Sequence, residues 1–222
     1  MAKAKAQKGG KDLLKGIKHY FQSTIKLEGE KIIYVDPFKI PGEPHDADII
    51  FCTHPHFDHM SPGDIKKIMK PETMLVVPKR KAKKFKKFGL AYVIGVKPFE
   101  DLKVGGVMLK TVPAYNIGKM FHRKRKNWLG YIITVNDSRY YFAGDTDRIP
   151  EMADIETDVA FLPVGGKYTM NAEEAAEAAN LIRPKVAVPI HFADIEGVGT
   201  RQDARTFVDN LDKEIEGVIL KD

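Results

Sequence analysis

Three histidines and one aspartate stand together in the segment Thr53-His-Pro-His-Phe-Asp-His59, directly after an apolar run. Imidazole nitrogens and carboxylate oxygens suit zinc, iron and manganese. In a tight loop, the alternate residues His54 and His56 can converge on one ion, while Asp58 and His59 turn toward a second. The structural alternative is a polar loop of histidines with ordinary partners. Because the chain has only seven histidines, their clustering favours a metal site.

Two further candidate ligands follow apolar stretches elsewhere in the chain. Asp145 comes after Phe142-Ala-Gly144, where the glycine permits close approach of the backbone. His191 comes after Pro189-Ile190. Alone, a Gly-Asp pair is common in turns, and a single histidine at a strand end more often has a structural role. Combined with the histidine segment, they indicate strands that deliver ligands to one rim.

Apolar and β-branched runs, separated by polar turns, predict the strands that must position these residues. Asn136-Asp-Ser138 predicts a hairpin turn, and Asn171-Ala-Glu-Glu174 is typical of a capping box. The expected strands are residues 31–36, 48–53, 73–77, 91–94, 107–112, 129–135, 139–143, 159–162, 185–188 and 217–220, and the expected helices are residues 62–69, 79–88, 171–182 and 200–211. This α/β (α+β) mixture predicts sheets covered by helices.

Length and composition indicate an ordinary globular protein, with 222 residues of which 43% are hydrophobic and 30% charged. We expect a flexible basic tail over residues 1–16 and a single domain over residues 17–222. The chain start lacks the apolar segment of a secretory signal, and no apolar run reaches the roughly 18 residues of a membrane span. The lone cysteine, Cys52, is expected in the core. These features favour a cytoplasmic protein without membrane contact.

The net charge of +6 is concentrated in two basic runs, residues 79–87 and 119–126. The first run also carries Ala82, Phe85 and Phe88 at helical spacing, which predicts a solvated helix with an apolar underside. The alternative is a surface for anions or nucleic acid. The second run lies beside the suspected site, where it would suit an anionic substrate, although a solvated loop explains it equally well.

Several segments together resemble the metallo-β-lactamase fold hydrolases, in particular the small metal-dependent hydrolases related to L-ascorbate-6-phosphate lactonase. The resemblance extends from about Ile17 to the end of the chain. The ordered set His-x-His-x-Asp-His, Asp145 and His191 is its most specific part. The matching pieces are Tyr34-Val-Asp36-Pro37, Thr53-His-Pro-His-Phe-Asp-His59, Val112-Pro-Ala-Tyr-Asn116, Ala143-Gly-Asp145-Thr146, Leu162-Pro-Val-Gly-Gly166 and Pro189-Ile-His191.

This resemblance implies a four-layer αβ/βα sandwich with two divalent metal ions, most favourably zinc, with manganese or iron as alternatives. It assigns His54 and His56 to the first ion, and Asp58, His59 and His191 to the second. Asp145 would bridge both ions, and Asp36 would steady the histidine loop from behind. The residues named in these assignments match the motif positions of the family.

The chain departs from the family where a third histidine of the first ion is usual. Asn116 stands at that place, and His122 follows six residues later. The first site can therefore use Asn116 or His122 as its third ligand, bind metal more weakly, or be empty under some conditions. Near the start, Phe21-Gln22-Ser23 replaces the Gly-His-Ser of many relatives, and we assign no metal role to it.

The chemistry implied is attack by a metal-activated hydroxide on an ester, lactone or phosphodiester, in a small anionic substrate. Asp58 and His122 are the candidate catalytic residues, since Asp58 could hold or shuttle a proton. Tyr168 and Arg123 are candidate substrate-binding residues, and a homo-oligomer is expected. Three alternatives remain: a nuclease or RNA-processing phosphodiesterase, which the basic runs favour; a di-iron redox protein, which usually has an acid where this chain has His56; and a non-catalytic metal-binding scaffold.

Overall fold

Six strands from the amino-terminal half form one mixed sheet in the computed structural model, which describes residues 9–220. Their order across the sheet is β1-β2-β3-β4-β5-β6, and β3 to β6 are parallel. Two helices, α2 and α3, follow β4 and β5. The bounds are β1 (Ile17–His19), β2 (Ile25–Glu28), β3 (Ile32–Val35), β4 (Ala47–Phe51), α2 (Pro62–Ile68), β5 (Met69–Pro78), α3 (Lys79–Phe85) and β6 (Tyr92–Val96).

Seven further strands form the second sheet, in the order β13-β12-β11-β10-β9-β8-β7. The strands from β10 to β13 run parallel, whereas β7, β8, β9 and β10 form an antiparallel meander. The bounds are β7 (Asp101–Val104), β8 (Val107–Ala114), η1 (Lys124–Lys126), β9 (Trp128–Val135), β10 (Ser138–Phe142), η2 (Pro150–Asp154), β11 (Val159–Pro163), α4 (Ala172–Ile182), β12 (Val186–Ile190), α5 (Arg201–Asp209) and β13 (Glu216–Gly217).

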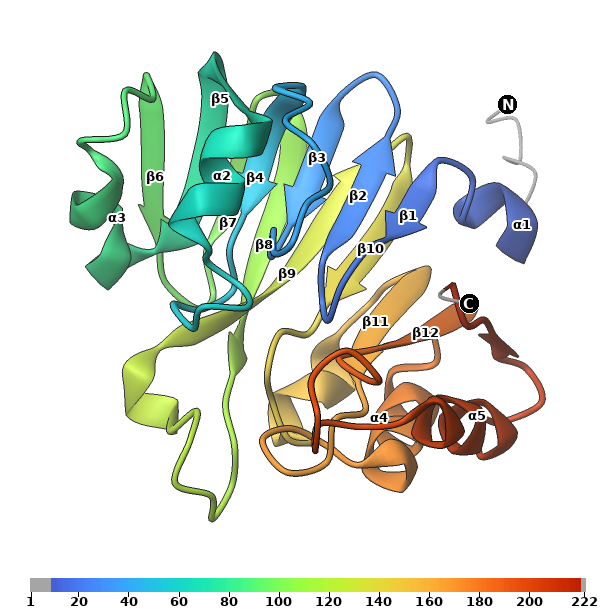
Figure 1. Cartoon of the computed structure of the whole chain (residues 1–222). Coiled ribbons are helices and arrows are strands. Elements are labelled where there is room, and N and C mark those ends of the chain that lie inside the picture. The colour runs from blue at the N-terminus through green and yellow to red at the C-terminus, as the bar shows by residue number, and fades with distance from the viewer. Residues whose placement is uncertain (1–8, 221–222) are drawn as a thin grey trace.

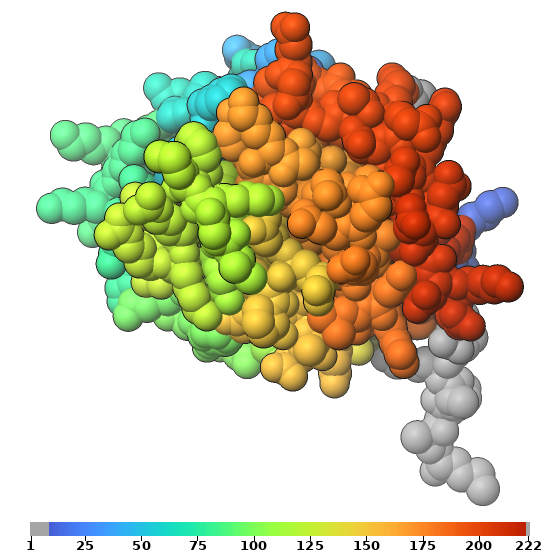
Figure 2. Space-filling view, turned by 90° about the horizontal axis from the view of Figure 1, so that it is seen from below, coloured from blue at the N-terminus to red at the C-terminus, as the bar shows by residue number. Residues whose placement is uncertain are grey.

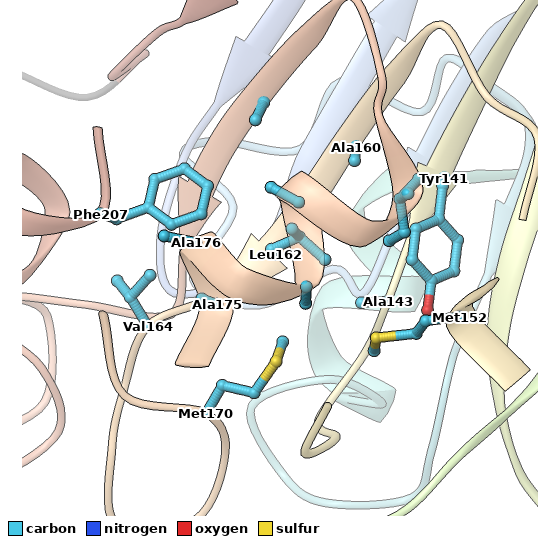
Figure 3. Packing of buried hydrophobic residues seen from close by; sticks show 14 of the residues in the cluster. Tyr141, Ala143, Met152, Ala160, Leu162, Val164, Met170, Ala175, Ala176 and Phe207 are labelled. Carbon is cyan, nitrogen blue, oxygen red and sulfur yellow. The ribbon is translucent and has the colours of Figure 1, made fainter. Parts of the chain in front are cut away.

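The two sheets face each other, and helices cover their outer faces (Figure 1). A buried cluster with Phe51 and Phe161 fills the space between the sheets. A second cluster packs Ile65 of α2 and Phe85 of α3 on the first sheet. The third packs α4 and α5 on the second sheet, and Figure 3 shows Phe207 and the small α4 alanines in it. The four-layer α/β sandwich that the sequence predicted is therefore present.

Local sequence signals explain several boundaries. Asn171 accepts a hydrogen bond from the backbone N–H of Glu174, whose carboxylate accepts from the N–H of Asn171, so the expected capping box begins α4. Asn136 and Asp137 both have positive φ angles, as a two-residue hairpin between β9 and β10 requires. Phe85 is buried beneath α3, and Cys52 is fully buried, as predicted.

Two expectations about the ends of the chain were wrong, and three strands were missed. Residues 10–13 form a short helix, α1 (Gly10–Leu13), whose Leu13 is buried, so the flexible tail does not extend to residue 16. The first eight residues of that tail lie outside the described residues. The expected strand 217–220 shrinks to two residues, because β13 pairs with β12 only at Glu216 and Gly217. The edge strands β1 and β7, and β2 between β1 and β3, were not predicted.

The topology brings the expected functional residues to one edge of the sandwich. Strands β3 and β4 end there, as do β8, β10 and β12, since parallel strands place their carboxyl ends at the same edge. In Figure 1 this edge carries the loops below the sheets. Within residues 9–220, no helix is long and apolar enough to cross a membrane.

Candidate metal centre

Asp36 holds the histidine loop from behind. Its Oδ1 accepts a hydrogen bond from the backbone N–H of Thr53 at 2.7 Å, and its Oδ2 accepts from Thr53 Oγ1 at 2.7 Å. The same Oδ2 lies 2.8 Å from Nδ1 of His59. Burial raises the pKa of Asp36, and the contacts with His59 and Thr53 oppose that rise. The side chain thus has the supporting position that the sequence predicted for it.

These contacts also fix which ring nitrogens face the centre. Nδ1 of His59 donates to Asp36, which turns Nε2 toward the centre as the nitrogen that can bind a cation. Thr53 Oγ1 uses its proton on Asp36, so at 3.0 Å it accepts from Nδ1 of His54. The hydrogen-bond network therefore assigns a free Nε2 to His54. Two imidazoles are held in the tautomer that a metal ion needs.

Seven side chains form two adjacent groups whose potential ligand atoms lie within 4.8 Å of one another in each group. The first group is His54, His56, His122 and Asp145, and the second is Asp58, His59 and His191. All of these residues except the partly exposed His56 are buried. The structure therefore brings together every residue that the sequence offered as a metal ligand, apart from Asn116.

Asp145 lies between the two groups and faces both. Its Oδ2 is 3.1 Å from Nε2 of His122 and 3.6 Å from Nε2 of His54. Its Oδ1 is 3.2 Å from Nε2 of His59 and 3.4 Å from Nε2 of His191. A carboxylate with one oxygen on each side can bridge two cations, which is the position that the family resemblance implies for Asp145.

The backbone that delivers these ligands is strained. Gly144, directly before Asp145, has a φ of +66°, and a Cβ atom there would lie 3.0 Å from the carbonyl oxygen of Leu129. His191 has a φ of 61° and His122 a φ of 55°, values that non-glycine residues rarely adopt. Such conformations persist where surrounding contacts enforce them, often at functional sites.

The electrostatics of the centre favour ligation at His54 and Asp145 and oppose it at His59. Burial lowers the pKa of His54 well below its usual value, so this ring is neutral with a free lone pair. Burial opposes ionisation of Asp145, but His191, His59 and His54 outweigh it and hold the pKa of this carboxyl well below its usual value. Burial also lowers the pKa of His59, yet Asp145 and Asp36 reverse the effect and raise that pKa well above its usual range, so a cation at this ring would have to displace a proton from Nε2.

Three ligand atoms in this centre make no hydrogen bond in the described structure, although they are fully buried. They are Nε2 of His59, Nε2 of His191 and Oδ1 of Asp145. In the first group, Nδ1 of His56 lies 3.0 Å from Nε2 of His54 and 3.2 Å from Nε2 of His122. Buried nitrogens and oxygens that converge in this way fit a cation of the zinc, iron or manganese type.

The segment between β8 and β9 brings His122 into the first group. The backbone N–H of Asn116 donates to the carbonyl of His122 at 2.8 Å, which folds the segment back on itself. The amide Nδ2 of Asn116 donates to the carbonyl oxygen of Tyr168 at 2.6 Å and lies 3.3 Å from Nδ1 of His122. Of the two alternatives from the sequence, the geometry therefore puts His122 among the ligand atoms and Asn116 behind it.

A cavity of about 400 Å³ opens above the centre. Tyr168 lines it, as predicted, and so do several residues that the sequence analysis missed, among them Phe57, Phe121 and Lys167. Arg123 does not line this cavity, and its Nε donates to the carbonyl of Met120 at 3.2 Å. Figure 2 views the molecule from below relative to Figure 1 and shows the segment of residues 115–127 (yellow-green) beside the orange segment after β11.

Fold and site together are those of a sandwich-type metallo-hydrolase. The profile of the beta-lactamase superfamily domain matches residues 18–191. A UPF0173 metal-dependent hydrolase of Pyrococcus abyssi is 33% identical over 193 residues, which cover 79% of this chain and 84% of the relative. Another, from Listeria monocytogenes serotype 4a, is 31% identical over 227 residues, which cover 92% of this chain and 96% of the relative.

A crystal structure from Parabacteroides distasonis, of a protein proposed to be a metal-dependent hydrolase, matches with a TM-score of 0.77 and 31% identity and covers 91% of both chains. The chain therefore belongs to the beta-lactamase superfamily and is a metal-dependent hydrolase. The closer relation to L-ascorbate-6-phosphate lactonase stays a prediction.

Proposed function

We propose that the enzyme uses two divalent cations, most favourably zinc, to hydrolyse an ester, lactone or phosphodiester bond in a small anionic molecule. The observation that carries this proposal is the position of Asp145 between two ligand groups, with one carboxylate oxygen toward each. When bound, the cations would supply Lewis acidity at the scissile group and lower the pKa of water toward neutrality. Manganese and iron would suit the same donor atoms.

We assign different roles to Asp58 and His122, the two candidate catalytic residues of the centre. The carboxylate of Asp58 lies 3.6 Å from Nε2 of His59 and 3.7 Å from Nε2 of His191, and it lines the cavity, so it can orient a water molecule and accept its proton. His122 was the second catalytic candidate. Its Nε2 faces the first ligand group, and one nitrogen cannot both bind a cation and carry a proton, so we assign it to ligation.

The residues that line the cavity indicate the kind of substrate that it would accept. Lys167 is its one cationic lining residue in the described structure and would attract an anionic group. Phe57 and Phe121 are both at least half exposed and would cover an apolar part of the substrate. Tyr168 packs edge to face on Phe121, at 5.0 Å between the ring centroids. A compact organic anion with an apolar portion fits these walls.

Elemental analysis of the purified protein, combined with cleavage assays, tests the proposal. We expect about two bound metal ions and chelator-sensitive hydrolysis of either bis(p-nitrophenyl) phosphate or a simple lactone. The preferred substrate separates a phosphodiesterase from a lactonase. His56→Ala should abolish turnover and lower the bound metal, since His56 belongs to the first group. Absence of metal and of cleavage after reconstitution with zinc, manganese and iron would overturn the proposal in favour of a scaffold.

Two expectations about the cellular setting remain proposals. The free Cys52 is buried, which fits a reducing compartment such as the cytoplasm. A homo-oligomeric state is the second, and size-exclusion chromatography with light scattering tests it directly.

A further inference from the structure

A second cavity, of about 450 Å³, lies beside the metal centre and is lined by five cationic side chains. No acidic residue of the described structure lines it. We name it the basic cleft. Its cations come from three separate segments, and Figure 1 shows the first and last of these, α3 and the helical turn of residues 124–126, on the same side of the molecule. The cations are Lys79, Arg80 and Lys81 of α3, Lys97 after β6, and Lys126 of η1.

The five cations of the basic cleft stand apart from acidic side chains in the described part of the chain. Within residues 9–220, none of them lies within ion-pair distance of an acidic side chain. Other lysines in the basic run of Lys126 differ, since Lys119 pairs with Asp147 and Lys124 pairs with Glu151. Like charges gathered in a cleft repel one another and raise the local positive potential. An anion in the cleft would remove that repulsion.

The inner wall of the basic cleft is shared with the metal centre. Pro55, which lines the cleft, stands between two residues of the first ligand group, His54 and His56. Trp128 also lines the cleft, and its ring centroid lies 4.9 Å from those of both histidines. A ligand in the basic cleft would therefore lie one side chain away from the ligands of the centre.

We propose that the basic cleft binds the phosphate groups of an extended polyanion, which is either a small polyphosphate or a single nucleic-acid strand. Cations from three segments match several phosphates better than one, and the volume of about 450 Å³ suits a small ligand. The indole ring of Trp128 offers a surface for a base in the second case. The site lies outside the catalytic cavity, so it does not depend on the proposed reaction.

The chain offers its own reporter and its own control for a test. Trp128 is the only tryptophan, so intrinsic fluorescence reports on the cleft wall. The double variant Lys79→Glu/Lys81→Glu reverses two cleft charges. The variant Lys83→Glu/Lys84→Glu makes the same change in net charge on the same helix, at residues that do not line the cleft. The probes are inorganic tripolyphosphate and a labelled single-stranded oligonucleotide of about twelve nucleotides.

We expect saturable binding of tripolyphosphate that the cleft variant weakens by about tenfold and the control variant by less than about twofold. For the oligonucleotide, the slope of log K against log salt should fall by about 1.4 in the cleft variant, or about 0.7 for each lost contact. Tighter oligonucleotide binding identifies a nucleic-acid source, and binding of tripolyphosphate alone identifies a small one. Binding of tripolyphosphate at the metal centre would be the same in the wild type, the cleft variant and the control variant, so it would not change the comparison between them. Equal weakening in both variants, or no saturable binding in the wild type, would overturn the proposal.

Discussion

Replacing Asp36 by asparagine would turn one buried acceptor into a donor directly behind the metal centre. Oδ2 of Asp36 receives hydrogen bonds from Thr53 Oγ1 at 2.7 Å and from His59 Nδ1 at 2.8 Å. If the amide nitrogen of the asparagine took the place of Oδ2, it would face two groups that also donate, Thr53 Oγ1 and His59 Nδ1. The opposite amide orientation would set the nitrogen against the backbone N–H of Thr53, which now donates to Oδ1 at 2.7 Å. Nδ1 of His59 can accept from the new amide only if its proton moves to Nε2.

That proton shift would remove a metal ligand, because Nε2 is the nitrogen of His59 that faces the second group. Loss of such a supporting carboxylate typically weakens metal binding by about 10-fold to 100-fold, or roughly 1.4 to 2.8 kcal/mol. The free energy of unfolding should also fall. Each hydrogen bond to the charged carboxylate contributes about 1.5 to 3 kcal/mol, whereas a bond to a neutral amide contributes about 0.5 to 1.5 kcal/mol.

Competition with a chromophoric chelator measures the zinc affinity, and urea denaturation with excess chelator measures the free energy of unfolding. Asp64→Asn is the matched control. Asp64 is buried in the first turn of α2, accepts from the backbone N–H groups of Lys39 and Ile40 at 3.0 Å, and belongs to neither ligand group. Its variant should lose stability and keep its zinc affinity. Wild-type zinc affinity in Asp36→Asn would refute the argument about the tautomer of His59.

Three further predictions follow from the same contacts. His122→Ala should roughly halve the metal content, whereas Asn116→Ala should leave it near two, as measured by elemental analysis; equal losses would contradict the assignment of His122. Tyr141→Phe should raise the free energy of unfolding by about 1 kcal/mol, since the buried hydroxyl beside Met152 has no hydrogen-bond partner in the described structure (Figure 3). Tyr140→Phe should lower it, because Tyr140 donates to the carbonyl of Leu13. Chelation should lower the thermal midpoint, by an amount equivalent to about 2.7 kcal/mol for a metal held at a hundred times its Kd.

The ligand set could be predicted from the sequence because its spacing is local. Three of the histidines lie in one segment, and Asp145 and His191 each follow an apolar strand that has a recognisable pattern. The capping box of α4 and the hairpin turn at Asn136 depend on neighbouring residues only. In each case the chemistry that forms the feature lies within a few residues along the chain.

Other features depend on contacts between distant segments, which spacing does not reveal. The edge strands β1 and β7 have three and four residues with mixed polarity, so pairing with a neighbour, rather than pattern, makes them strands. Arg123 was expected to bind substrate because its basic run lies beside the site, yet His122 lines the cavity while Arg123 donates to the carbonyl of Met120. Lys167 enters the cavity from the loop after β11, next to the predicted Tyr168.

The centre also joins the two halves of the sandwich. His54 and His56 follow a strand of the first sheet, whereas His122 and Asp145 follow strands of the second, and the second ligand group is divided in the same way by His191. A cation in either group would therefore connect both sheets.

Without a bound cation, the backbone strain and the unmade hydrogen bonds of the centre lower the stability of the fold. Positive φ angles at Asp36, His122 and His191 each cost about 1 to 3 kcal/mol. Three buried ligand atoms add the free energy of unmade hydrogen bonds. A bound cation would satisfy the ligand atoms and hold the strained residues in place, so metal binding would be linked to the stability of the contact between the sheets.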